Sequence, residues 1–130
     1  MNVKIDTKEK FTVITLNEPY LTANMTVDLE SILKSYLAKE IPHIVLNMEK
    51  VQKLNEETGE IIAVIQQQFY ENNHSFIICG LQKEPEDMLD KMELLELMNV
   101  TPTESEAWDI VQMEEIEREL TNDEETGNES

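Results

Sequence analysis

The chain has 130 residues and a mass of 15.1 kDa, enough for one domain with a single buried core. Its 10 basic and 28 acidic residues give a formal net charge of -18. Nucleic acid and anionic membranes repel such a chain, so we exclude both as partners. The single cysteine allows no intramolecular disulfide and no cysteine-rich zinc site. The sequence opens with no signal-peptide core and holds no run of 18 apolar residues, so we expect a cytoplasmic protein without direct membrane insertion.

The first third of the chain predicts two strands, a helix and a buried strand. Residues 3–5 and 11–16 carry the strand pattern and are joined by a hairpin turn at 7–10. Apolar residues at helical spacing between 29 and 37 predict a helix, with Thr26 as its N-cap. Residues 43–48 form a mostly apolar run, which is typical of a parallel strand buried on both faces.

The remainder predicts three more helices and two more strands. A helical face follows at 61–69, then a buried strand at 75–79, then a helix that begins around Pro85 and a brief extended piece at 99–101. A capping box at 103–106 opens the last helix, which should end near residue 120. The side chains expected to face inward from this helix are Ala107, Ile110, Val111, Ile116 and Leu120.

Strands that alternate with helices need crossover connections, and crossovers produce parallel strand pairs. The predicted fold class is therefore α/β, a mixed β-sheet of four to five strands with about four helices packed on it. Residues 1–120 should form the domain, and residues 121–130 an acidic disordered tail, because the last ten residues carry no large apolar side chain. The residues expected in the core are Ile44, Leu46, Ile62, Ile65, Ile77 and Val111.

Acidic residues gather toward the end of the chain, with a net charge of -1 over residues 1–50, -7 over 51–103 and -10 over 104–130. The commoner explanation for this accumulation of acidic residues is a solvated helix face. The more specific explanation is a surface that attracts a basic partner. Met98 and Met113 do not follow the core spacing, which makes them candidates for an adaptable binding surface.

Sequence motifs for chemistry are scarce. Three glycines leave no G-x-G-x-x-G motif and no P-loop. We interpret His43 and His74, at the starts of different strands, as surface or strand-edge residues, and Cys79 as a buried thiol. No cofactor, metal or catalytic residue is expected. Acid–base chemistry by Glu56 and Glu57 is the enzymatic alternative, although no nucleophile or metal site accompanies them.

The order of these motifs resembles a STAS domain, the fold shared by sulfate transporters and anti-sigma factor antagonists. A strand at 44–48 (IVLNM) leads through 51–54 (VQKL) to a helix start at 55–59 (NEETG), and the next strand ends in Gly80-Leu81. The stretches 99–107 and 113–120 look like the variant found in Bacteroidetes anti-anti-sigma proteins. The resemblance covers residues 1–120.

The resemblance implies a regulatory, non-catalytic protein that binds an anti-sigma factor or a kinase-like regulator. In this family a D-S-S-G motif opens the helix, and phosphorylation of its first serine switches binding off. Aligned on Gly59, the aspartate corresponds to Glu56, the phosphoacceptor serine to Glu57 and the second serine to Thr58, in a loop one residue longer than usual. The site implied for partner binding is Asn55, Glu56, Glu57, Thr58 and Gly59.

Two interpretations of the missing serine stay open. Glu57 can act as a fixed negative charge in place of phosphoserine, or Thr58 can serve as an exposed acceptor one position along. We favour the first, because one residue turns a helical side chain by about 100°. A homodimer is possible, and an accessory subunit of a transporter or lipid-trafficking complex is the alternative role that the resemblance offers.

Overall fold

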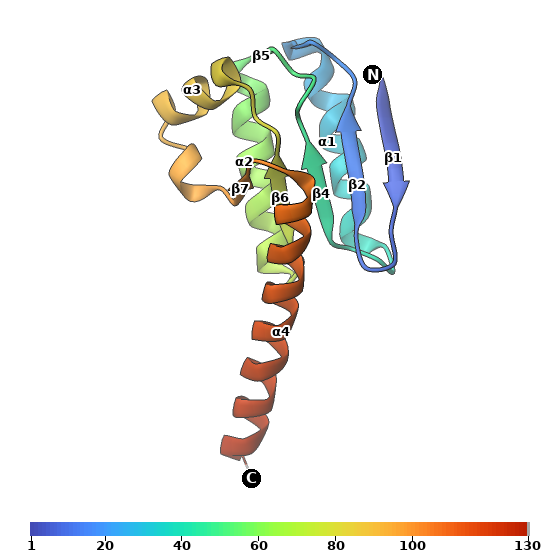
Figure 1. Cartoon of the computed structure of the whole chain (residues 1–130), viewed down its shortest axis with the longest axis vertical. Coiled ribbons are helices and arrows are strands. Elements are labelled where there is room, and N and C mark those ends of the chain that lie inside the picture. The colour runs from blue at the N-terminus through green and yellow to red at the C-terminus, as the bar shows by residue number, and fades with distance from the viewer. Residues whose placement is uncertain (130) are drawn as a thin grey trace.

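A five-stranded sheet forms the centre of the molecule (Figure 1). The computed structural model describes the backbone of residues 1–129 and the side chains of residues 1–121. In spatial order the strands are β1 (Val3–Thr7), β2 (Thr12–Leu16), β4 (Ile44–Asn47), β6 (Phe76–Cys79) and β7 (Val100–Thr101). Only β1 runs antiparallel to its neighbour, as the opening hairpin requires. The predicted α/β class with a mixed sheet is confirmed.

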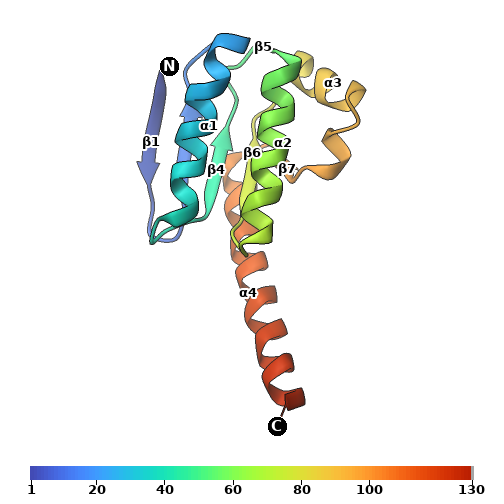
Figure 2. The same ribbon diagram turned by 180° about the vertical axis from the view of Figure 1, so that it is seen from behind.

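Helices cover both faces of this sheet. The first face carries α1 (Thr26–Ser35) and α2 (Glu56–Glu71), and the opposite face carries α4 (Glu104–Glu129), as Figures 1 and 2 show from the two sides. The shorter α3 (Lys83–Lys91) lies beside the start of α2 and next to a small parallel pair, β3 (Tyr20–Leu21) with β5 (Lys53–Leu54). Residues 1–129 also contain three short 3₁₀ turns: η1 (Ala23–Met25), η2 (Tyr36–Ala38) and η3 (Leu95–Leu97).

The central strands β4 and β6 are buried at every position because the sheet is covered on both faces. Alternate side chains of β4 enter different cores: Ile44 and Leu46 pack toward α1 and α2, whereas Val45 packs with Ile77 and Val111 on the α4 side. The six residues predicted for the core are at most 1% exposed, so this prediction is confirmed.

The predicted N-cap at Thr26 is wrong. Met25 occupies the N-cap position in an α conformation, without a side-chain cap, because η1 has already brought the backbone into helical geometry. The Thr26 side chain is buried instead and contacts Thr58. At the other end of the chain the cap at Thr103 is present, since its Oγ1 accepts the N–H of Glu106 at 3.2 Å.

The inward placement of Ile116 and Leu120 is also wrong, because both are 57% exposed. Beyond Val111 the helix leaves the apolar part of the sheet, and polar side chains occupy its inner side. The helix itself continues to Glu129, past the predicted end near Leu120, since no proline stops it. The side chains of 122–130 lie outside the described residues, so the acidic tail stays a prediction.

The polar contacts that fix the middle of α4 form a cluster at the end of the sheet where β4 and β6 begin. The Tyr70 hydroxyl donates to Glu114 Oε1 at 2.9 Å, and an Arg118 guanidinium nitrogen donates to Ser75 Oγ at 3.0 Å. His43 Nε2 lies 3.2 Å from Glu115 Oε1, while its Nδ1 accepts the N–H of Ser75 at 2.9 Å. Burial lowers the pKa of His43, although Glu115 opposes this shift, so this histidine at the start of a strand is buried in the cluster and does not lie on the surface.

We expect Ile77→Ala to lower the free energy of unfolding by about 2–5 kcal/mol, because it opens a cavity beside a central strand. Urea denaturation followed by circular dichroism measures the change. Val27→Ala is the matched control, since Val27 is 77% exposed on α1 and should change stability by less than about 0.5 kcal/mol. A loss below about 1 kcal/mol for Ile77→Ala would contradict the placement of β6.

Candidate functional site

The site predicted from the sequence lies at the first turn of α2, where β5 ends. Asn55 is the N-cap in extended conformation, and its Oδ1 accepts the N–H of Glu57 at 2.9 Å. The Asn55 N–H donates to Leu21 O at 3.0 Å, which joins the helix start to β3. The asparagine therefore fixes both the end of the loop and the beginning of the helix.

Glu56 and Glu57 are exposed in the first turn of α2. Carboxylates are favoured there because the unpaired N–H groups of a helix start carry partial positive charge. Both side chains are open to water and stand as surface charges rather than as buried acid–base groups. This arrangement suits the attraction of a cationic surface.

Thr58 is fully buried, which contradicts its expected exposure as an alternative acceptor. Its Oγ1 lies 3.2 Å from Thr26 Oγ1, so the two hydroxyls form a hydrogen bond between α2 and α1. The first turn of α2 thus has a solvent side with two glutamates and a protein side with one threonine. A kinase that needs an exposed hydroxyl does not reach Thr58 in this conformation.

Gly59 is buried at the contact of α2 with α3. A Cβ atom added there would lie 3.2 Å from Leu89 Cδ2 and 3.6 Å from both Leu54 Cδ2 and Met92 Sδ. The absence of a side chain therefore lets α3 approach the start of α2 closely. Packing at this position explains the glycine without any ligand.

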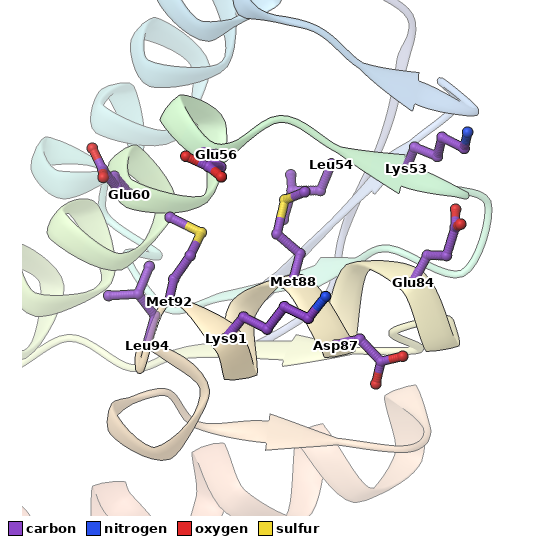
Figure 3. Close-up of a pocket in the computed structure, with 10 residues that line it drawn as sticks. All are labelled: Lys53, Leu54, Glu56, Glu60, Glu84, Asp87, Met88, Lys91, Met92 and Leu94. Carbon is purple, nitrogen blue, oxygen red and sulfur yellow. The ribbon is translucent and has the colours of Figure 1, made fainter.

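A hollow of about 760 Å³ opens between α2 and α3 (Figure 3). Figure 3 shows Met88 and Met92 projecting from the α3 segment toward the first turns of α2, near Leu54. The charged residues of the lining are four acids, Glu56, Glu60, Glu84 and Asp87, and two bases, Lys53 and Lys91. The hollow therefore combines an apolar floor with an acidic rim.

A second hollow of about 740 Å³ adjoins the first on the β3 side. It includes Glu56 and Glu57 together with Tyr20, which is 52% exposed. Sequence reasoning found the glutamates but missed Tyr20, because β3 is a two-residue strand with no recognisable pattern of its own. Met88 is half-buried: it packs against the core and also lines both hollows.

The family model of the STAS domain matches residues 2–107. The chain belongs to the STAS domain family, as the order of its motifs predicts. Among proteins of curated function, none matches the sequence. Within the described residues, no helix is both long enough and apolar enough to cross a membrane.

Solved structures of low sequence identity share the fold. An anti-sigma factor antagonist from Mycobacterium paratuberculosis has a TM-score of 0.75 at 14% identity, covering 85% of this chain and 93% of that chain. A serine-to-glutamate variant of RsbS from Moorella thermoacetica has a TM-score of 0.72 at 14% identity, covering 86% and 96%. The murine anion transporter Slc26a9 has a TM-score of 0.60 at 12% identity, but the match covers 80% of this chain and 18% of the transporter.

Replacing the Thr58 hydroxyl by a methyl group should leave the Thr26 hydroxyl buried without its partner. We expect Thr58→Val to lower the free energy of unfolding by about 1–3 kcal/mol, measured by urea denaturation. The double variant Thr26→Val/Thr58→Val should lose less than the sum of the two single losses, because it removes both polar groups together. Strictly additive losses would contradict a hydrogen bond between the two residues.

Proposed function

We propose that this protein is a non-catalytic regulatory module that binds an anti-sigma factor or kinase-like regulator through the start of α2 and the two hollows beside it. The single observation that carries the proposal is that Glu57 is exposed in the first turn of α2. Aligned on Gly59, this is the position that we assign to the family's phosphoacceptor serine. Membership of the STAS family and the likeness to anti-sigma factor antagonists support this role. Such a role places the protein in the cytoplasm.

Glu57 carries a constant negative charge, whereas phosphoserine carries about -1.5 to -2 and only after modification. The Asn55 cap and the buried Thr58 hold this turn in place, so the charge has a defined position. A partner that distinguishes phosphoserine from serine would find at Glu57 a permanent charge that lies between the charges of those two states. We infer that the protein is fixed in one regulatory state.

The chemistry of the two hollows supports a partner with a basic, partly apolar surface. Met88, Met92 and Leu54 offer an adaptable apolar floor for one side chain of the partner. Glu56 and Glu60 face the same hollow and attract cationic groups at its rim. Tyr20 supplies an exposed aromatic ring of the kind enriched at the centres of interfaces.

Binding to the kinase-like anti-sigma proteins encoded in the native host tests the proposal. We expect Glu56→Gln/Glu57→Gln to weaken binding by about tenfold or more in titration calorimetry, because it removes two charges at the contact and keeps side-chain size. Glu40→Gln/Glu71→Gln is the matched control, since both of those carboxylates are exposed away from the start of α2. Equal losses in the two variants would show a general charge effect and contradict this site.

Phosphorylation gives a second test of the same position. Wild-type protein should take up no phosphate on the first turn of α2 from a family-type kinase and ATP, because the Thr58 hydroxyl, one position along from Glu57, is buried. Glu57→Ser should accept one phosphate, since it places a hydroxyl on the exposed side of the helix start, where N–H groups stabilise the added charge. Intact-mass spectrometry measures the uptake.

Two outcomes of that experiment count against the proposal. A phosphate on wild-type protein that disappears in Thr58→Ala would make Thr58 the acceptor and the fixed-charge interpretation wrong. If Glu57→Ser also stays unmodified by a kinase that phosphorylates its own antagonist, Glu57 does not occupy the acceptor position.

A second candidate function is an accessory subunit of a transporter or lipid-trafficking complex, and the fold likeness to part of murine Slc26a9 favours it. Affinity purification from the native host separates the two roles. A histidine-kinase-like ATPase or a phosphatase among the bound proteins supports the first role, and a membrane permease complex supports the second.

A further inference from the structure

Three large apolar side chains on α4 face solvent. Met113 is 54% exposed, and Ile116 and Leu120 are each 57% exposed. Spacings of three and four residues place them on one side of the helix, over about 10 Å of its axis. We call these three residues the α4 stripe. The stripe includes Met113, which does not follow the core spacing, and Ile116 and Leu120, which were wrongly expected to be buried.

The α4 stripe lies on the side of the helix that faces away from the domain. The opposite side is occupied by contacts: Ala107 and Val111 pack on the sheet, and Glu114 and Arg118 join the polar cluster below it. Figure 1 shows α4 in front of the sheet and extending beyond it, so no other described element covers its outer side. A repacking of the same domain would therefore not bury the stripe.

The charges around the α4 stripe are of one sign. Asp109, Glu117 and Glu119 are exposed along this part of the helix. Arg118 is the only basic residue in 104–130, and it is turned inward, where it contacts Ser75 Oγ at 3.0 Å and lies 4.0 Å from Glu114. No basic side chain on the described part of α4 therefore offsets the carboxylates beside the stripe.

We propose that the α4 stripe docks an amphipathic helix of a partner protein whose polar face is rich in lysine and arginine. Apolar residues at steps of three and four over two turns match the apolar face of a second helix packed along the first. The flanking carboxylates select a basic partner and speed its encounter. A second copy of this chain is disfavoured, because each carries a net charge of -18 and the two stripes would bring acidic helices together.

This surface is separate from the proposed site at the start of α2. The α4 stripe belongs to the helix that covers one face of the sheet, whereas α2 covers the other face (Figures 1 and 2). The proposal does not rest on Glu57 or on an anti-sigma partner. A variant at the start of α2 can therefore lose its partner while peptide binding at the α4 stripe is retained, and a variant of the stripe can show the reverse. Failure of one proposal would leave the other standing.

Fluorescence anisotropy with a labelled synthetic peptide tests the proposal on the full chain. The probe is a helix of about 18 residues, five turns, with leucine on one face and lysine on the other. A peptide of the same composition in scrambled order is its control. We expect the ordered peptide to bind wild-type protein at least about tenfold more tightly than the scrambled one, because only the ordered peptide forms an apolar face.

The matched variants separate apolar contact from charge. Met113→Gln/Ile116→Gln/Leu120→Gln keeps charge and helix propensity and should weaken binding of the ordered peptide by about tenfold or more. The control Val27→Gln/Val64→Gln changes side chains that are 77% and 50% exposed on other helices and should stay within about twofold. Circular dichroism checks that all variants keep their helix content.

Three results would overturn the proposal. Equal affinity for ordered and scrambled peptides would reduce the interaction to charge alone. Unchanged binding of the triple variant would remove the stripe from the contact. A dimer of wild-type protein in sedimentation velocity that the triple variant abolishes would assign the stripe to a second copy.

Discussion

The first turn of α2 depends on one buried contact, the hydrogen bond between Thr58 and Thr26. It joins the two helices on the same face of the sheet and determines which side of the turn faces the protein. With Thr58 inside, Glu56 and Glu57 can only face outward. Gly59 completes the arrangement, since its missing side chain brings α3 against the same turn. The position of the two surface charges is therefore a consequence of packing beneath them.

The same division between a packed side and an open side governs α4, but there it changes along the helix. Its first turns bury Ala107 and Val111 against the sheet, and its middle turns are fixed by Glu114, Glu115 and Arg118 through polar contacts. Because those polar side chains take the inner positions, the apolar residues of these turns are left outside. The inner side of a helix need not be its apolar side once it passes the end of a sheet.

This reversal explains where sequence reasoning succeeded and where it failed. Strands such as β4 and β6 were predictable because they are short, mostly apolar runs, with Pro42 just before β4 and Gly80 just after β6. Their burial follows from helices on both faces of the sheet. Ile116 and Leu120 were misplaced because apolar periodicity was extended beyond the sheet that justifies it. Thr26 was misplaced because a preceding 3₁₀ turn has no signature in the sequence.

The candidate site shows the same limit. Asn55, Glu56 and Glu57 follow from cap chemistry and from the resemblance to a family motif, so their place at a helix start was predictable. The burial of Thr58 was not, because it depends on Thr26, 32 residues away along the chain. Tyr20 and the half-buried Met88 enter the site through β3 and α3, and only the folded chain brings these segments together.

The proposed role of Glu57, a permanent charge at the family's acceptor position, has a consequence for regulation. A phosphorylation switch needs two states with different partner affinity, and it can shift the equilibrium only by the difference between them. With Glu57 exposed and Thr58 buried, the first turn of α2 presents no accessible hydroxyl for such a switch. Under the proposed function, control of binding then comes from the partner, from the amount of protein, or from a second surface. The α4 stripe, which we propose as a docking surface, lies on the other face of the sheet, so a partner held there would leave the start of α2 free.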